Sequence, residues 1–328
     1  MQRGSLLLVM AAACWQKPSA TTGSVTSSVM ARPQPRSGLA CAFVSARDSE
    51  NHWSNAQIYL VDGVHRIPVN LTNDAQTNWA PAISPDGREM VFVASRGHGL
   101  FVLELETDES REVPIATPGQ PASPRWLSGH RIAYAAFTDR TAVWLVDMRG
   151  DSPRQLTSPG PKESDDGGFA MIDGGKRIVF SRYDRLTGER HLYVANTDGS
   201  DSPIRITNTS KVSETLPTVS HEGQLLAFRR FAHTDFSDQI RIVSTRDFSL
   251  VRDISLASPA KWNINGLDFT GDDRQIVFGA DADDVGGNLQ NLHGELFVVG
   301  VDGGNQRRLT KNAAYDGQPA CMPAVISK

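Results

Sequence analysis

One pattern of residues recurs six times along this chain. In the clearest copy, Pro81 precedes a Ser-Pro-Asp-Gly turn at 84–87, and apolar runs follow at 90–92 and 100–105. An aromatic residue closes the first run of every copy, and these residues are 42 to 50 positions apart: Phe43, Phe92, Tyr134, Phe180, Phe228 and Phe278. Such a period indicates a repeat architecture. Because a unit of short strands cannot bury its own faces, the copies must stack radially against one another.

Each copy predicts four short strands. Proline at the second turn position fixes φ and glycine accepts positive φ, so the Ser-Pro-Asp-Gly sequence predicts a hairpin between the first and second strands. Alternating apolar residues predict the third strand, as at 57–61 and 295–299. A Leu-Thr or Ile-Thr pair marks the fourth strand in four copies, at 71–72, 156–157, 206–207 and 309–310. In the second and fifth copies, spacing alone places the fourth strands near 112–115 and 250–254.

The two ends of the repeat region complement each other. The first copy, from about Gly38, lacks a first strand, whereas 315–323 is a lone first strand in which Pro319 occupies the place of Pro81. A C-terminal strand that completes the N-terminal blade would remove both free sheet edges. The sequence therefore predicts an all-β fold, a six-bladed β-propeller of four-stranded antiparallel blades, in one domain from 38 to 326.

Alignment of the repeats places two cysteines opposite each other. Cys321 takes the position of Ile83 and Cys41 that of Met90, and these positions face each other across the hairpin. Opposed residues of antiparallel strands bring their Cβ atoms to about 4.5–5.5 Å, near disulfide reach. We expect a Cys41–Cys321 disulfide that ties the chain ends together, and two buried free thiols are the alternative.

The N-terminal residues predict export. A basic start at 1–3, an apolar run at 6–13 and then Cys14 resemble a bacterial lipoprotein signal peptide, and eight apolar residues are too few to cross a bilayer. We expect a signal peptide at 1–13, a lipid on Cys14, and a flexible tether at 14–37, much of it rich in Ser, Thr and Pro. Ala11 stands where such signals usually carry Leu. Cleavage without lipidation is therefore one alternative, and a buried N-terminal helix is another.

Composition and missing motifs narrow the function. The chain has 328 residues, is 39% hydrophobic and carries a formal net charge of -4, as expected for a soluble globular domain. No nucleic-acid partner is expected, because binding to polyanions needs an excess of Lys and Arg. The sequence contains no nucleophile elbow, His-Glu-x-x-His, phosphate-binding loop or Cys-x-x-Cys motif. Enzymatic activity is therefore uncertain, and binding is the favoured role.

The repeat as a whole resembles the TolB-type propeller repeat. Residues 84–92 are similar to the start of that repeat, and Asp-Gly-Gly-x-x-x-Arg-Leu-Thr at 302–310 is similar to its end. The resemblance implies a periplasmic six-bladed ring that binds partners at the mouth of its channel. TolB itself carries an additional N-terminal α/β domain before its propeller, whereas only the tether is expected before the ring here.

Strand direction alternates, so two kinds of connection lie at each end of the expected ring. Turns between first and second strands are tight, whereas connections between second and third strands are long at 45–56, 182–190, 229–238 and 280–294. Long loops on a rigid scaffold are the usual seat of binding. We therefore expect partners to dock on the loop-rich face, with Trp53 as one contact.

Polar residues recur three positions before the proline of the first strand. Four copies carry Asn78, Asp166, Glu214 and Asp316 there. Radial stacking would bring these side chains around the channel entrance, where carboxylates concentrate negative potential. Such a mouth would favour a cation or a basic segment, and carboxylates that cap turns in water are the alternative.

One acidic segment has oxygen ligands of the kind that calcium binds. Asp281, Asp283 and Asp284 lie close to two glycines, although their spacing is not that of an EF-hand. A solvated acidic loop is the alternative, and no other cofactor is expected. Histidines at 52, 98, 233 and 293 fall in connections between second and third strands, where they could form a metal or acid–base cluster or lie scattered on the surface.

Two functions are consistent with these features. The first is an exported, lipid-anchored propeller that binds or scaffolds an envelope protein or peptide segment. It would be a monomeric domain, periplasmic or anchored at the outer membrane, and would contact the membrane only through its lipid. The alternative is a metal-assisted polysaccharide hydrolase or lyase that uses the acidic channel mouth. A propeller that captures a small sugar or peptide differs from the first only in ligand size.

Overall fold

The computed structural model describes residues 38–48, 55–62, 67–115, 119–127, 130–160, 164–257, 262–281 and 294–324. The chain divides into two compact units, 1–34 and 35–328, and all described residues belong to the second. The predicted signal peptide, Cys14 and the tether therefore lie outside the described residues. Among the residues that are described, no helix is long and apolar enough to cross a bilayer.

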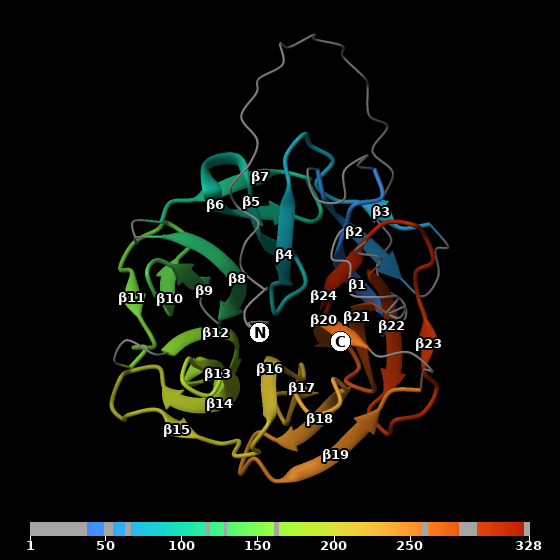
Figure 1. Ribbon diagram of the computed structural model, residues 1–328. Coiled ribbons are helices and arrows are strands. Elements are labelled where there is room, and N and C mark those ends of the chain that lie inside the picture. The colour runs from blue at the N-terminus through green and yellow to red at the C-terminus, as the bar shows by residue number, and fades with distance from the viewer. Residues whose placement is uncertain are drawn as a thin grey trace, which may run out of the picture. The chain divides into compact units, whose positions relative to one another are not determined.

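The described residues form six four-stranded antiparallel sheets arranged in a ring, so the predicted six-bladed β-propeller is confirmed (Figure 1). We number the sheets as blades 1 to 6 and give the strands of each from the centre of the ring outwards. Blade 1 has β24 (Asp316–Cys321), β1 (Ala40–Ser45), β2 (Gln57–Asp62) and β3 (Val69–Asn70); blade 2 has β4 (Asn78–Ile83), β5 (Glu89–Ala94), β6 (Gly99–Glu104) and β7 (Ser110–Val113); blade 3 has β8 (Gln120–Leu127), β9 (Arg131–Phe137), β10 (Thr141–Asp147) and β11 (Arg154–Gln155).

Blades 4 to 6 follow the same order. Blade 4 has β12 (Ser164–Ile172), β13 (Arg177–Asp184), β14 (Glu189–Asn196) and β15 (Ile204–Arg205); blade 5 has β16 (Val212–Val219), β17 (Leu225–Ala232), β18 (Asp238–Ser244) and β19 (Leu250–Ser255); blade 6 has β20 (Asn263–Phe269), β21 (Gln275–Asp281), β22 (Gly294–Gly300) and β23 (Arg307–Arg308). Among the residues that the structure describes, two short 3-10 helices, η1 (Arg96–His98) and η2 (Asp173–Gly175), lie in connections. Strands β7 and β19 are the two fourth strands that spacing alone had placed.

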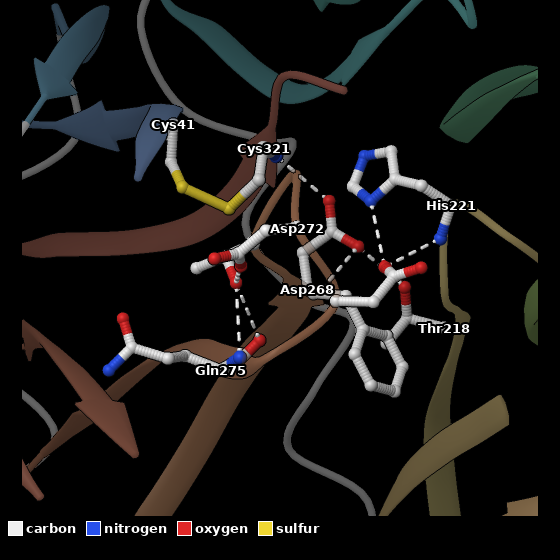
Figure 2. Close-up of a disulfide and its surroundings, with 10 residues drawn as sticks. Cys41, Thr218, His221, Asp268, Asp272, Gln275 and Cys321 are labelled. Atoms are coloured by element: carbon white, nitrogen blue, oxygen red, sulfur yellow. Dashed lines mark hydrogen bonds and ion pairs between the residues drawn. A yellow bond between two sulfur atoms is a disulfide. The ribbon is translucent and has the colours of Figure 1, made fainter. Parts of the chain in front are cut away.

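The chain closes the ring as the sequence predicts. The C-terminal strand β24 pairs with β1, and Cys41 is the Cα partner of Cys321 in this pairing. A disulfide joins the two residues, with the sulfur atoms 2.08 Å apart and 280 residues between them in sequence. Figure 2 shows this disulfide beside Asp268 and His221, which belong to blades 6 and 5. Blade 1 therefore contains both ends of the repeat region.

The repeated aromatic residues form the centre of each blade. All six are at most 1% exposed. Apolar clusters lie between neighbouring blades; in one of them Val91 and Val93 of blade 2 pack with Ile132 and Tyr134 of blade 3. Burial of one such large side chain contributes roughly 1.5–3 kcal/mol. Each blade thus buries its faces against its neighbours, which is the physical reason for the repeat.

A β-bulge in the inner strands explains the repeated proline. In blades 1, 2, 3 and 5, the proline and the residue before it together face one aromatic residue of the second strand. The residues before proline are Gln318, Ala80, Ser123 and Leu216, with φ between 47° and 54°. Proline cannot donate a ladder hydrogen bond and disfavours helical geometry in the residue before it. The bulge bends and twists the strand that lines the centre of the ring.

The Leu-Thr pairs end the two-residue outer strands with a repeated hydrogen-bond arrangement. In blade 6, the Leu309 amide donates to the Leu296 carbonyl at 2.7 Å, and the Thr310 hydroxyl accepts from the Leu296 amide at 2.9 Å. The equivalent bonds in blades 1, 3 and 4 join Leu71 and Thr72 to Ile58, Leu156 and Thr157 to Val143, and Ile206 and Thr207 to Leu192. The threonine side chain therefore substitutes for a backbone ladder partner.

In two connections that the sequence predicts to be long loops, about half of the residues belong to strands. In blade 4 only 185–188 separate β13 from β14, and in blade 5 only 233–237 separate β17 from β18. Pairing continues through this region, with Arg182 opposite His191 and Tyr183 opposite Arg190. The expectation of long loops at 182–190 and 229–238 was therefore wrong, because charged residues there continue the β-ladder.

Candidate interaction face

The two ends of the ring differ in their connections. We call the end that carries the connections between second and third strands, and between blades, the loop face. The opposite end, with the hairpins between first and second strands, is the turn face. Among the described residues, the loop face carries the extended hairpins of blades 4 and 5, which project as regular strands.

Two large apolar side chains stand at the tips of these hairpins. Leu186, between β13 and β14, is 76% exposed, and Phe236, between β17 and β18, is 57% exposed. The ring of Phe231 packs against that of Phe236, with ring centroids 6.1 Å apart. Large apolar side chains held in water on rigid strands are typical of a protein interaction site.

Hydrogen bonds join the two hairpins into one surface. The amide of Lys211, just before β16 of blade 5, donates to Glu189 Oε1 of blade 4 at 2.7 Å. The Arg190 amide of blade 4 donates to the Ser213 hydroxyl of blade 5 at 3.0 Å. Ser213 in turn contacts His233 Nε2 at 2.8 Å. These bonds connect blade 4 to blade 5 directly below the exposed tips, so the two tips are held on a common support.

A buried polar cluster lies deeper between the same blades. His191 faces two carboxylates, with Nδ1 at 2.8 Å from Glu214 Oε2 and Nε2 at 3.1 Å from Glu189 Oε2. Thr207 also donates to Glu214 at 3.1 Å. Burial raises the pKa of Glu214, and the hydrogen bonds from His191 and Thr207 act against that rise. The cluster serves the blade contact, because its central residues are hidden from solvent.

The four predicted mouth residues are also buried. Asn78, Asp166, Glu214 and Asp316 are each at most 1% exposed, at the starts of inner strands β4, β12, β16 and β24. Asp166 accepts two hydrogen bonds from Arg182, at 2.6 and 2.9 Å, and Asp316 accepts two from Arg47, at 3.0 and 3.1 Å. The side chains therefore do not present open carboxylates to solvent, and a binding role for them stays a prediction.

The arginine partners of these acids share a second contact. The guanidinium of Arg182 lies 5.2 Å from the ring centroid of Phe180, and that of Arg47 lies 5.3 Å from the ring centroid of Phe43. In blade 5, Arg229 forms the same kind of pair with Asp238, at 2.7 and 3.0 Å. Arg182 and Arg47 thus each lie over a buried ring while an acid balances their charge. Asp166 and Asp316 thus form local ion pairs with arginines, whereas Glu214 faces His191 and Thr207.

The remaining predicted site residues are described only in part. Trp53, Asp283, Asp284, His52 and His293 lie outside the described residues. Asp281 is at the end of β21, where its Oδ2 accepts a hydrogen bond from Asn263 Nδ2 at 3.2 Å. Within the described ranges, no group of three or more His, Cys, Asp or Glu side chains is arranged to hold a metal ion. The calcium loop therefore stays a prediction.

Comparison with known proteins supports the fold. No family model matches this chain. TolB from Acinetobacter baumannii is similar with a TM-score of 0.68 at 15% identity, over 87% of this chain and 67% of that one. A putative TolB from Agrobacterium tumefaciens has a TM-score of 0.64 at 18% identity, over 85% and 90%. An oligogalacturonate lyase in complex with manganese has a TM-score of 0.52 at 14% identity, over 80% and 85%. The chain therefore has a TolB-like propeller fold.

The exposed hairpin tips are the feature that sequence reasoning missed. Leu186 and Phe236 each lie in a short turn between charged or aromatic strand residues. The signal that could have identified them is a single apolar residue in a short turn between two strands that pair with each other up to the turn. The expectation of long loops at 182–190 and 229–238 hid this signal.

Proposed function

We propose that this protein is an exported, lipid-anchored β-propeller of the bacterial cell envelope that binds a partner protein or peptide segment on its loop face. The N-terminal sequence supports export and a lipid on Cys14. The Cys41–Cys321 disulfide supports an oxidising compartment, because structural disulfides persist mainly outside the cytosol. The similarity to TolB structures supports an envelope role through analogy of fold.

The exposed apolar tips of blades 4 and 5 carry the docking part of this proposal. Leu186 and Phe236 would each lose water on contact with a partner, and full burial of such a side chain contributes roughly 1.5–3 kcal/mol. The strands beneath them are fixed by the hydrogen bonds between blades, so little conformational entropy is lost on binding. The expected partner surface is therefore an apolar groove or an amphipathic segment of an envelope protein.

Substitution of the two tips tests this proposal. A Leu186→Glu, Phe236→Glu double variant should lose most partner recovery when the tagged protein is purified from crosslinked envelope membranes. Ile67→Glu is the matched control, because Ile67 is 79% exposed and lies on the turn face. Equal recovery by the double variant and the unchanged protein would contradict docking on the loop face. Loss of recovery by Ile67→Glu alone would place the interface on the turn face.

A second candidate is a metal-assisted polysaccharide hydrolase or lyase. The similarity to an oligogalacturonate lyase in complex with manganese favours it over other enzyme classes. Metal analysis of the purified protein separates the two candidates. A tightly held stoichiometric calcium or manganese would support the enzyme. Its absence, with unchanged stability on chelation, would favour the binding protein.

A further inference from the structure

Three blades hold one of their own arginines over an aromatic ring of the third strand. In each blade, this ring belongs to the residue that pairs with the repeated aromatic residue of the second strand. The distances from guanidinium carbon to ring centroid are 4.6 Å for Arg47 and Tyr59, 4.1 Å for Arg96 and Phe101, and 5.1 Å for Arg182 and Tyr193. A carboxylate lies beside each arginine, at 3.0 Å for Asp316, 3.5 Å for Asp74 and 2.6 Å for Asp166. The repeat therefore builds a guanidinium site from a ring and an acid.

Blade 3 has the ring of this site but not the arginine. Trp144 pairs with Tyr134, as the corresponding residues pair in blade 1. Thr138 stands four positions after Tyr134, whereas blades 1 and 2 have their arginine four positions after the repeated aromatic. Among the described residues, no cation lies over the Trp144 ring. The guanidinium site of blade 3 is therefore built without its cation.

The remaining two blades differ from blade 3. In blade 5, Arg241 itself pairs with Phe228, so no ring stands at this position of the third strand. In blade 6, the indole of Trp262 packs against the third-strand ring of Phe297, with ring centroids 4.8 Å apart. Blade 3 is thus the one blade whose third-strand ring has neither a cation nor a second ring over it within the described ranges.

A pocket of about 350 Å³, lined by Trp144, lies where the other blades have the arginine. Ala136 and Thr138 also line it, at the positions that Ser45 and Arg47 occupy in blade 1. Because Arg47 donates to the Ser45 hydroxyl at 2.8 Å, the equivalent Ala136 marks the place of the missing guanidinium group. The connection between β9 and β10 lines the pocket, which places it at the loop face. Strands β10 and β11 lie on the outer side of the ring, away from its centre (Figure 1).

The pocket offers two acceptors to a cation. Asp139 lines it and forms no ion pair with any residue that the structure describes. Gln155 donates through Nε2 to the Thr157 carbonyl at 2.7 Å, which leaves its Oε1 as an acceptor. Arg140 also lines the pocket, but its Nη1 donates to the Gly160 carbonyl at 2.8 Å. The volume falls within the range of small-ligand sites.

We propose that this pocket binds a guanidinium group, carried by an arginine side chain of the partner segment. The planar cation would stack on the indole, the ring that attracts cations most strongly, and donate to Asp139 and Gln155. Arg140 carries a like charge and therefore weakens the site. The choice of a partner's arginine rests on the proposed function, whereas the affinity for a guanidinium group does not.

Titration with an end-capped arginine tests the pocket in the absence of a partner. The probe is N-acetyl-arginine N-methylamide, and its citrulline counterpart has nearly the same shape without the charge. The Nε1–H signal of Trp144, assigned by its loss in Trp144→Phe, should shift on addition of the arginine compound. The citrulline compound should bind at least about tenfold more weakly, because the cation–π contact and a charge-assisted hydrogen bond are lost. The lysine counterpart, which lacks the planar group, should also bind more weakly.

Matched variants test the equivalence with the other blades. Thr138→Arg supplies the arginine that blades 1 and 2 carry at this position, so it should fill the pocket and abolish binding. Thr187→Arg adds the same charge to the exposed connection between second and third strands of blade 4, and it should bind the probe normally. Asp139→Asn should weaken binding by about threefold, and Arg140→Gln should strengthen it. Thermal melting of each variant checks that the ring remains folded.

The outcomes separate the pocket from the docking proposal. No shift at saturating probe, equal affinity for the citrulline or lysine compound, or equal blocking by Thr138→Arg and Thr187→Arg would overturn the guanidinium site. Partner recovery from crosslinked membranes should fall in Thr138→Arg, and unchanged recovery would overturn the assignment to a partner's arginine. Normal binding of the probe by the Leu186→Glu, Phe236→Glu variant is expected, because the hairpin tips do not line the pocket.

Discussion

At the scale of single residues, the ion pair between Asp166 and Arg182 explains one of the repeated acids. Asp166 is fully buried and its partner Arg182 is 16% exposed, so neither charge can be hydrated freely. The hydrogen bond to Asp166 helps to raise the pKa of Arg182, although burial, the largest effect, lowers it. Such a pair adds little stability over an apolar pair, but loss of one partner is costly. Asp166 and Asp316 are therefore best understood as counter-ions of Arg182 and Arg47.

Substitution of Asp166 tests this reading. Asp166→Asn should lower the free energy of unfolding by about 3–5 kcal/mol, because it leaves Arg182 buried and unpaired. Chemical denaturation measures the change. Asp165→Asn is the control, since its partner Arg185 is 45% exposed and a surface pair contributes about 1 kcal/mol or less. Equal effects of the two substitutions would contradict the counter-ion role.

At the scale of elements, hydrogen bonds join the hairpin turn of blade 5 to that of blade 6 next to the ring closure, and we call this contact the clasp. The His221 and Glu222 amides of blade 5 donate to the Asp273 carboxylate of blade 6, at 2.7 and 2.8 Å, and His221 Nδ1 lies 3.2 Å from it. Burial alone would lower the pKa of His221, but Asp273, Asp268 and the Cys321 backbone raise it overall. Burial would raise the pKa of Asp273, but hydrogen bonds from His221 and Glu222 lower it.

This clasp predicts a pH-dependent contribution to stability. A raised pKa in the fold means that protonated His221 stabilises fully below its ordinary pKa of 6.5, and that this contribution is lost as the pH rises through the folded-state value. The Asp273 contribution is present above 3.8 and is lost as the pH falls through its lowered value. His221→Gln should therefore destabilise more at pH 5 than at pH 8, by up to about 1 kcal/mol.

Denaturation midpoints at the two pH values measure this difference. His130→Gln, which removes an exposed histidine from the corresponding turn of blade 3, is the control variant. A penalty for His221→Gln that stays constant or grows towards pH 8 would show that the clasp does not depend on protonation.

At the scale of the whole molecule, closure of the ring depends on one pairing between chain ends. Strand β24 joins β1 and the disulfide covalently fixes that pairing. A ring with an unpaired inner strand would expose two sheet edges. The chain-entropy model gives larger stabilisation for longer closed loops, and this loop spans nearly the whole propeller.

Removal of the disulfide should weaken the closed ring. Cys41→Ser with Cys321→Ser should lower the free energy of unfolding by about 2–5 kcal/mol. Reductant should destabilise the unchanged protein by a similar amount and leave the double variant unaffected. Thermal melting with and without reductant measures both effects. A double variant as stable as the oxidised protein would contradict a role for the disulfide in closure.

The candidate site was less predictable than the fold, because its residues come from distant parts of the sequence. Asp316 and its partner Arg47 are 269 positions apart, so no local pattern connects them. Leu186 and Phe236 lie on the hairpins of two neighbouring blades, 4 and 5, and 50 residues of sequence separate them.

The sequence by itself determined the number of blades, the position of the closing strand and the pairing of Cys41 with Cys321. It could do so because the period of the apolar runs and the turn residues act locally and repeat in every blade. Only the tertiary structure decided which carboxylates are buried beside arginines and which hairpins extend beyond the ring. Those outcomes depend on contacts between blades, where side chains far apart in the chain compete for the same buried space.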